Sequence, residues 1–284
     1  MQSGEQWGWR FIDLAALGRN TWRSYVATLL RVIFLPLAFL ALVVAGLFFV
    51  DAGPLLRDSE VPTSVIALAT GSVIVMGLGL VWGVVRSHRR PWMSLISPDL
   101  RLDWRRLAIG AAVGGALLAL SVGLGRLVAG EPSPAASAIT LPGLLVVLLL
   151  VPLQAASEEM LFRGYLTQAL GRVLRRRAVI AVVVGLLFGA VHLNAYGPLT
   201  IPYLLVLSLV YSAVSLRDER LELVIGAHTA NNWLAIGAFG ALGAAGRGVR
   251  LDWPAFAILI VNGALFYGIT RALVRRFCQP RAAP

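Results

Sequence analysis

One stretch dominates the sequence: LPGLLVVLLLVPLQAA at residues 141–156, followed at once by SEEMLFRG at residues 157–164. A charge at the centre of a membrane helix costs at least about 2.5 kcal/mol, so two carboxylates and an arginine at the end of this apolar run need a purpose. On a helix, Glu159 and Arg163 share one face, whereas Glu158 points about 100° away. We therefore expect Glu159 to pair with Arg163 and Glu158 to be available for chemistry.

The composition is that of a membrane protein. Of the 284 residues, 58% are hydrophobic and 14% are charged, with a mean hydropathy of +0.79, whereas soluble domains carry about 25% charged residues. Apolar runs of about 20 residues, the length that spans a bilayer, recur along the chain. The sequence predicts an all-α, polytopic membrane protein with about eight transmembrane helices.

The expected transmembrane helices cover approximately residues 27–50, 64–85, 107–129, 141–170, 178–196, 199–216, 221–242 and 254–274. Residues 1–26, rich in tryptophan and arginine, are expected either to lie in the membrane interface or to pack on the protein. Residues 27–140 then hold the first three transmembrane helices, residues 141–277 hold a helical core with the other five, and residues 278–284 form a C-terminal tail.

The basic residues follow a topological pattern. The formal net charge is +11, and because no lysine occurs, all 25 basic residues are arginines. They gather in the connections after the second and fourth expected helices and near both ends of the chain. The positive-inside rule then places both termini in the cytoplasm. We expect these arginines to contact anionic lipids at the cytoplasmic face and not nucleic acid. Arg247 and Arg250, between helices seven and eight, are the exception to the pattern.

The acidic residues and histidines inside the expected spans are concentrated in three helices. The carboxylates that lie well inside a span belong to the glutamate pair, and His192 and His228 lie in the fifth and seventh helices. Glu158 and His192 stand equally far before and after Arg175, so an antiparallel helix pair would place them at equal depth. Asn232 follows His228 by one helical turn on the same face. We expect Glu158, His192, His228 and Asn232 to meet in one intramembrane site.

This set of side chains suits peptide hydrolysis. A carboxylate can take a proton from water while the water attacks a carbonyl carbon, and an imidazole with an amide can stabilise the oxyanion. Alternatively, Glu158, His192 and His228 would bind zinc as a two-histidine, one-carboxylate site with an open position for water. The zincin helix motif, the Gly-x-Ser-x-Gly elbow and paired intramembrane aspartates do not occur in the sequence.

Three motifs occur in order on successive expected helices: Glu158-Glu159-x-x-x-Arg163, Phe188-x-x-x-His192 and His228-x-x-x-Asn232. Together they resemble the motifs of the CAAX prenyl protease type II and bacteriocin-processing family of intramembrane endopeptidases, also called the CPBP, Abi or Ras-converting-enzyme-like group. The resemblance covers about residues 141–277, and it implies that this helical core is catalytic. The expected number of transmembrane helices agrees with the fold of that family.

The resemblance also implies roles for the motif residues. Glu158 would be the general base that activates water, with His192 beside it, and His228 with Asn232 would form the oxyanion site. The ion pair next to Glu158 would support them. The family is described as metal-dependent in some accounts and as glutamate-dependent in others, and the sequence does not decide whether a zinc cofactor is used. Asn231 faces about 100° away from Asn232 on a helix, so we assign the motif to Asn232.

The expected partner is a membrane-associated peptide or protein substrate. The absence of lysine indicates a GC-rich genome and hence a bacterial plasma membrane, where prenylated substrates are not expected. Two other classes of function stay open. A proton-coupled transporter would use Glu158, His192 and His228 as a relay, although no inverted repeat is visible in the sequence. A bacteriocin-immunity or scaffold protein would share the fold without catalysis.

Overall fold

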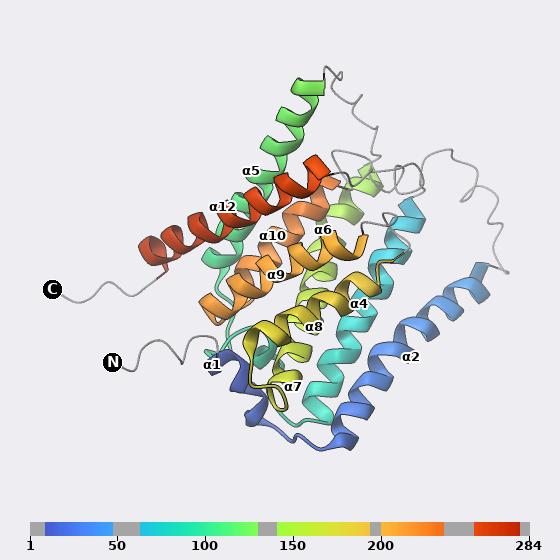
Figure 1. Cartoon of the computed structure of the whole chain (residues 1–284). Coiled ribbons are helices and arrows are strands. Elements are labelled where there is room, and N and C mark those ends of the chain that lie inside the picture. Colours follow the sequence, from blue (N-terminus) through green and yellow to red (C-terminus); the bar gives the residue numbers. More distant parts are fainter. Residues whose placement is uncertain (1–8, 48–62, 130–140, 194–199, 236–252, 279–284) are drawn as a thin grey trace, which may run out of the picture.

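The computed structural model describes residues 9–47, 63–129, 141–193, 200–235 and 253–278, and these ranges contain helices and turns but no strand. The elements are α1 (Trp9–Ile12), α2 (Trp22–Leu47), α4 (Thr63–Arg86), α5 (Trp104–Ala129), α6 (Leu141–Glu159), α7 (Thr167–Gly171), α8 (Arg177–Ala190), α9 (Thr200–Asp218), α10 (Glu222–Trp233) and α12 (Trp253–Phe277), with the 3₁₀ turns η1 (Asp13–Leu17) and η2 (Trp92–Leu95) and the π-helical segment η3 (Met160–Leu166). The prediction of an all-α fold is confirmed for the described residues (Figure 1).

Six helices are long and apolar enough to cross a membrane: Trp22–Gly46, Ile66–Arg86, Trp104–Leu124, Gly143–Gly171, Thr200–Asp218 and Phe256–Phe277. α8 is apolar but shorter, and α10 ends at Trp233 in the described part of the chain. The protein is therefore a multi-pass integral membrane protein, but the expected count of eight spans is not confirmed. α2 lies at the edge of the bundle (Figure 1) and exposes Leu29, Phe34 and Leu42, as expected of a surface that faces lipid.

Several helix ends that precede or follow arginine-rich connections lie together at one end of the molecule. The Ser24 hydroxyl of α2 donates to the carbonyl of Ser87 after α4, over 3.1 Å. At the start of α5, the Arg106 Nε donates to the Asp218 carboxylate at the end of α9, over 3.1 Å. Such a common end agrees with the prediction that the arginine-rich connections lie on one side of the membrane. The cytoplasmic position of the termini stays a prediction, and the connection with Arg247 and Arg250 lies outside the described residues.

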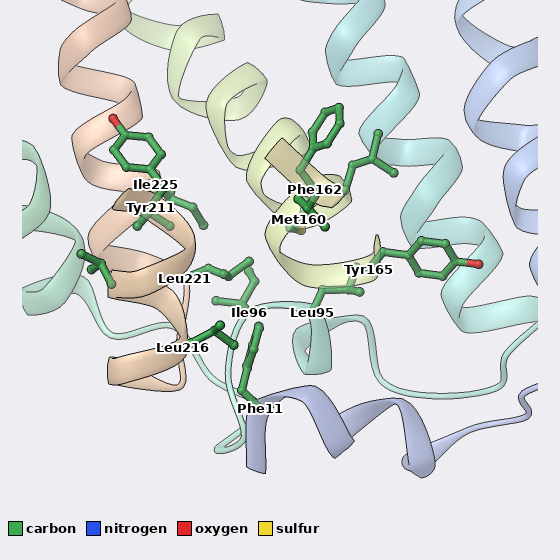
Figure 2. Packing of buried hydrophobic residues seen from close by; sticks show 14 of the residues in the cluster. Phe11, Leu95, Ile96, Met160, Phe162, Tyr165, Tyr211, Leu216, Leu221 and Ile225 are labelled. Carbon is green, nitrogen blue, oxygen red and sulfur yellow. The ribbon is translucent and has the colours of Figure 1, made fainter. Parts of the chain in front are cut away.

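The N-terminal segment packs on the protein. Phe11 and Ile12 of α1 are fully buried, and Phe11 points toward Ile96 and Leu216 (Figure 2). α1 and η1 also contact α7, the end of the helix that carries the glutamate pair. Of the two expectations for residues 1–26, the described part therefore fits the one of a segment packed on the protein, and α2 already begins at Trp22.

A cluster of charged side chains attaches the start of α10 to the loop before α5. The guanidinium of Arg220 forms ion pairs with Asp99 and with Glu222, whose Oε1 lies 2.7 Å from the Arg220 Nη2. Glu222 is fully buried, and its Oε1 also accepts a hydrogen bond of 3.0 Å from the backbone N–H of Asp103. Burial raises the pKa of Asp103, but hydrogen bonds from the backbone and side chain of Arg106 outweigh it and leave this pKa below its usual value. The cluster sets the height of α10 in the bundle.

Glycines let α5 and α10 cross in close contact. A Cβ atom built at Gly110 of α5 would lie 2.0 Å from the carbonyl oxygen of Leu223, and one at Gly226 of α10 would lie 2.1 Å from the carbonyl oxygen of Leu107. Real Cβ atoms do not approach backbone oxygens so closely, so only glycine permits this spacing. The close crossing fixes the rotation of α10, the helix that carries His228.

We predict that Gly110→Ala lowers the free energy of unfolding by about 1–3 kcal/mol, because the new methyl group overlaps the backbone of α10 and forces the helices apart. Gly123→Ala is the matched control in the same helix, since a Cβ atom there meets nothing within 4 Å. Alanine is the better helix former, so this control leaves stability unchanged or slightly raised. Thermal unfolding in detergent compares the two variants, and equal effects would contradict the close crossing.

Candidate active site

The glutamate pair lies where the α-helical hydrogen-bonding pattern changes. Glu158 and Glu159 are the last residues of α6, and the chain continues without a break into the π-helical segment η3, which contains Arg163. Such segments occur often at functional sites. η2 lies beneath η3, where a Cβ atom at Gly164 would approach the carbonyl oxygen of Leu95 to 2.8 Å, and Figure 2 shows Leu95 under this turn. The apolar core therefore supports the segment that carries the charges.

Glu159 is the buried anchor of the site. Its side chain is fully buried, and its Oε1 accepts a hydrogen bond of 3.0 Å from the Nη1 of Arg163. The predicted pairing of these two residues is confirmed. The same oxygen accepts a second hydrogen bond, of 2.7 Å, from the Nδ1 of His228. This contact between α6 and α10 was not predicted, because sequence spacing gives no rotation of one helix relative to another.

His228 lies between the two glutamates. Since the carboxylate of Glu159 accepts the hydrogen bond, the Nδ1 of His228 carries a proton, and the Nε2 faces the other glutamate, 3.6 Å from the Oε2 of Glu158. Both carboxylates and the imidazole are buried. Glu158 and His228, which the sequence predicts to share a site, therefore lie next to each other, and the imidazole ring contacts both carboxylates.

Aromatic rings desolvate the positive charge of the site. The guanidinium carbon of Arg163 lies 4.5 Å from the ring centre of Phe188 and 5.5 Å from that of Tyr211, which are cation–π distances. The two carboxylates and the single guanidinium leave one net negative charge in the buried set. The imidazole of His228, which contacts both carboxylates, can carry the positive charge that balances it.

Asn232 reaches Glu158 through a glutamine. The Nδ2 of Asn232 donates to the Oε1 of Gln154 over 2.9 Å, and the Nε2 of Gln154 donates to the Oε1 of Glu158 over 2.7 Å. Asn231 donates to the Oδ1 of Asn232 over 3.1 Å. Sequence reasoning missed Gln154, although a glutamine one turn before Glu158 in an apolar run is a usable signal.

His192 takes a different position from the one expected. α8 ends at Ala190, so His192 lies in the following turn and not on a helix that continues to residue 196. Its Nδ1 bonds the carbonyl oxygen of Phe188 over 2.8 Å, and its ring lies 4.7 Å from the ring of Phe188. Between the described residues, no hydrogen bond or ion pair joins His192 to Glu158 or His228. The ring centre of Phe188 also lies 6.5 Å from that of His228.

The expected zinc ligands do not fit a metal site in this arrangement. Among the described residues, no group of three or more histidine, cysteine, aspartate or glutamate side chains is arranged to hold a metal ion. The Nδ1 of His192 is engaged by the carbonyl oxygen of Phe188, and the Nδ1 of His228 by Glu159. The side chains that do converge form an acid–base pair with amide donors.

Comparison with known proteins gives two matches. A family model described as "Type II CAAX prenyl endopeptidase Rce1-like" matches residues 139–234, which include Glu158, Gln154, His228 and Asn232. An uncharacterized protein of Bacillus subtilis (strain 168), YyaK, is 30% identical over 279 residues, which cover 89% of this chain and 92% of that protein. No solved structure gives a significant match. The similarity thus extends beyond the site over most of the helical bundle.

Proposed function

Because the chain belongs to the Rce1-like family of type II CAAX prenyl endopeptidases, we propose that it is an intramembrane endopeptidase that cleaves a membrane-associated peptide or protein. The observation that carries the proposal is the buried imidazole of His228 between the carboxylates of Glu158 and Glu159. A histidine oriented by one carboxylate and facing a second is an arrangement suited to general acid–base catalysis.

In the proposed reaction, Glu158 is the base. A water molecule is hydrogen-bonded to the Oε2 of Glu158 and lies next to the substrate carbonyl carbon. It transfers a proton to Glu158 as its oxygen attacks this carbon. The protonated His228, held by Glu159 through Nδ1, donates through Nε2 to the oxyanion that forms. Two carboxylates, the Arg163 guanidinium and this imidazolium carry no net charge together, so the buried resting state is neutral.

Asn232 helps to stabilise the oxyanion, and Glu158 then passes its proton to the leaving amine. Asn232 uses one amide hydrogen for Gln154, and its other hydrogen donates to the oxyanion. When the carbon–nitrogen bond breaks, Glu158 gives its proton to the leaving amine and becomes a carboxylate again. The products are a new carboxyl terminus and a new amine. His192, at the end of α8, is proposed to bond the substrate or the attacking water through its Nε2.

No step of this reaction runs through a metal ion, because the three expected ligands do not converge among the described residues. In the part of the chain that the structure describes, no contact of comparable specificity supports the transporter or immunity alternatives. A relay through His192 would need a bonded path from His228, and no hydrogen bond joins the two histidines within the described ranges.

We predict that the purified protein cleaves members of a mixed library of membrane peptides, and that Glu158→Gln lowers the rate at least about 100-fold, the usual contribution of a general base. His192→Ala lowers it as well, and cleavage persists in the presence of a chelator. Glu219→Gln, the same chemical change in the turn after α9, serves as the control and leaves the rate unchanged. Mass spectrometry of the products measures each rate.

Three outcomes would contradict this reading of the site. Cleavage at the wild-type rate by Glu158→Gln would remove Glu158 as the base. Loss of wild-type cleavage with chelator, restored by added zinc, would replace the carboxylate mechanism with a metal-dependent one. Solute uptake by vesicles that Glu158→Gln abolishes, without any cleavage, would favour a transporter.

We also propose that the protein resides in a bacterial plasma membrane and binds anionic lipids through exposed arginines at the common end of the helices. Arg275 and Arg276 in the last turn of α12 are both exposed. Each arginine near an anionic surface contributes about 1 kcal/mol. We predict that phosphatidylglycerol raises the melting temperature more than phosphatidylcholine does, and that an Arg275→Gln/Arg276→Gln double variant reduces this difference. Equal melting temperatures in both lipids would contradict lipid binding.

A further inference from the structure

Gln154 connects Glu158 of α6 to Asn232 of α10. It lies one helical turn before Glu158 on α6 and is buried, with 8% of its surface exposed. Its amide nitrogen donates to the Oε1 of Glu158 and its amide oxygen accepts from Asn232 of α10. Both ends of the side chain are therefore used, and each end bonds a different proposed catalytic group.

The direction of these hydrogen bonds follows from the ionised carboxylate. A carboxylate only accepts hydrogen bonds, so the NH₂ group of Gln154 must face Glu158 and its oxygen must face Asn232. Asn232 then presents its own NH₂ group to Gln154 and its oxygen to Asn231, which donates to it. The chain of three amides thus runs in one direction and ends on Glu158.

The chain of three amides also determines which oxygen of Glu158 is free. Gln154 occupies Oε1, and Oε2 is left facing the Nε2 of His228 at 3.6 Å. Without this bond, the carboxylate can rotate about its terminal torsion, which has broad minima. The amide of Asn232 would lose its acceptor at the same time, so its second hydrogen would no longer point toward the oxyanion.

We propose that Gln154 is a positioning residue that holds the Glu158 carboxylate toward His228 and the Asn232 amide toward the oxyanion. The inference rests on the proposed peptidase function. It assigns to Gln154 no contact with substrate. A displacement of catalytic groups by about 1 Å can cost about 100-fold in rate, so an orienting side chain matters for turnover more than for substrate binding.

Gln168 provides a matched control. Like Gln154, it is buried and bridges a donor and an acceptor. Its Oε1 accepts from Arg90 over 2.7 Å, and its Nε2 donates to the carbonyl oxygen of Ser94 over 2.8 Å. These partners lie under η3 and outside the site. Gln168→Met therefore removes the same two kinds of bond as Gln154→Met, with the same change of side-chain shape.

The test compares the two variants in peptide cleavage and in chemical labelling. For Gln154→Met we expect kcat to fall about ten- to 100-fold with KM within about twofold of the wild type. For Gln168→Met we expect kcat per folded protein to stay within about twofold while the melting temperature falls. Unchanged kcat in Gln154→Met, or an equal loss in both variants, would overturn the positioning role.

Labelling with a membrane-permeant carbodiimide reports on the contact without requiring cleavage. Freed from Gln154, the Glu158 carboxyl should react several-fold faster in Gln154→Met than in the wild type. Glu159, which keeps its bonds to Arg163 and His228, is the internal control, and mass spectrometry locates the adducts. Equal labelling of Glu158 in both proteins would overturn the inference. A wild type that labels as expected but cleaves no peptide would count against the proposed function and not against this contact.

Discussion

The site depends on one shared oxygen atom, the Oε1 of Glu159, which accepts hydrogen bonds from Arg163 within its own helix and from His228 of α10. A buried carboxylate is costly unless it is paired and hydrogen-bonded, and here one oxygen provides both kinds of compensation. The same atom joins the two helices that carry the proposed catalytic groups. The glycine crossing of α5 with α10 and the ion cluster of Arg220 then hold α10 at the height and rotation that this contact needs.

Two adjacent glutamates therefore occupy different environments on one helix. The 100° step between neighbouring residues turns Glu159 toward the arginine and Glu158 toward a polar chain of amides and the open nitrogen of His228. Glu159 is fixed by two charged or chargeable donors, whereas Glu158 keeps one oxygen 3.6 Å from the Nε2 of His228. Such a division between an orienting and a reacting carboxylate lets a single motif supply both roles without a further acidic residue in the described part of the site.

The sequence predicts the features that depend on the spacing of residues within one helix. The helices follow from apolar length, and the pairing of Glu159 with Arg163 follows from their four-residue separation. The contacts between helices could not be derived in the same way, because the rotation of α10 is set by glycines and by the Arg220 cluster. The fifth helix is expected to continue past His192, but α8 ends at Ala190 and His192 lies in the following turn.

The central claim is that Glu158 and His228 act as one unit, and a double-mutant cycle in kcat/KM tests it most directly. Residues that act together lose their contribution once when either is removed. The account predicts that a Glu158→Gln/His228→Gln double variant cleaves no more slowly than the slower single variant. If the two losses multiply instead, the carboxylate and the imidazole act independently, and the central claim is wrong.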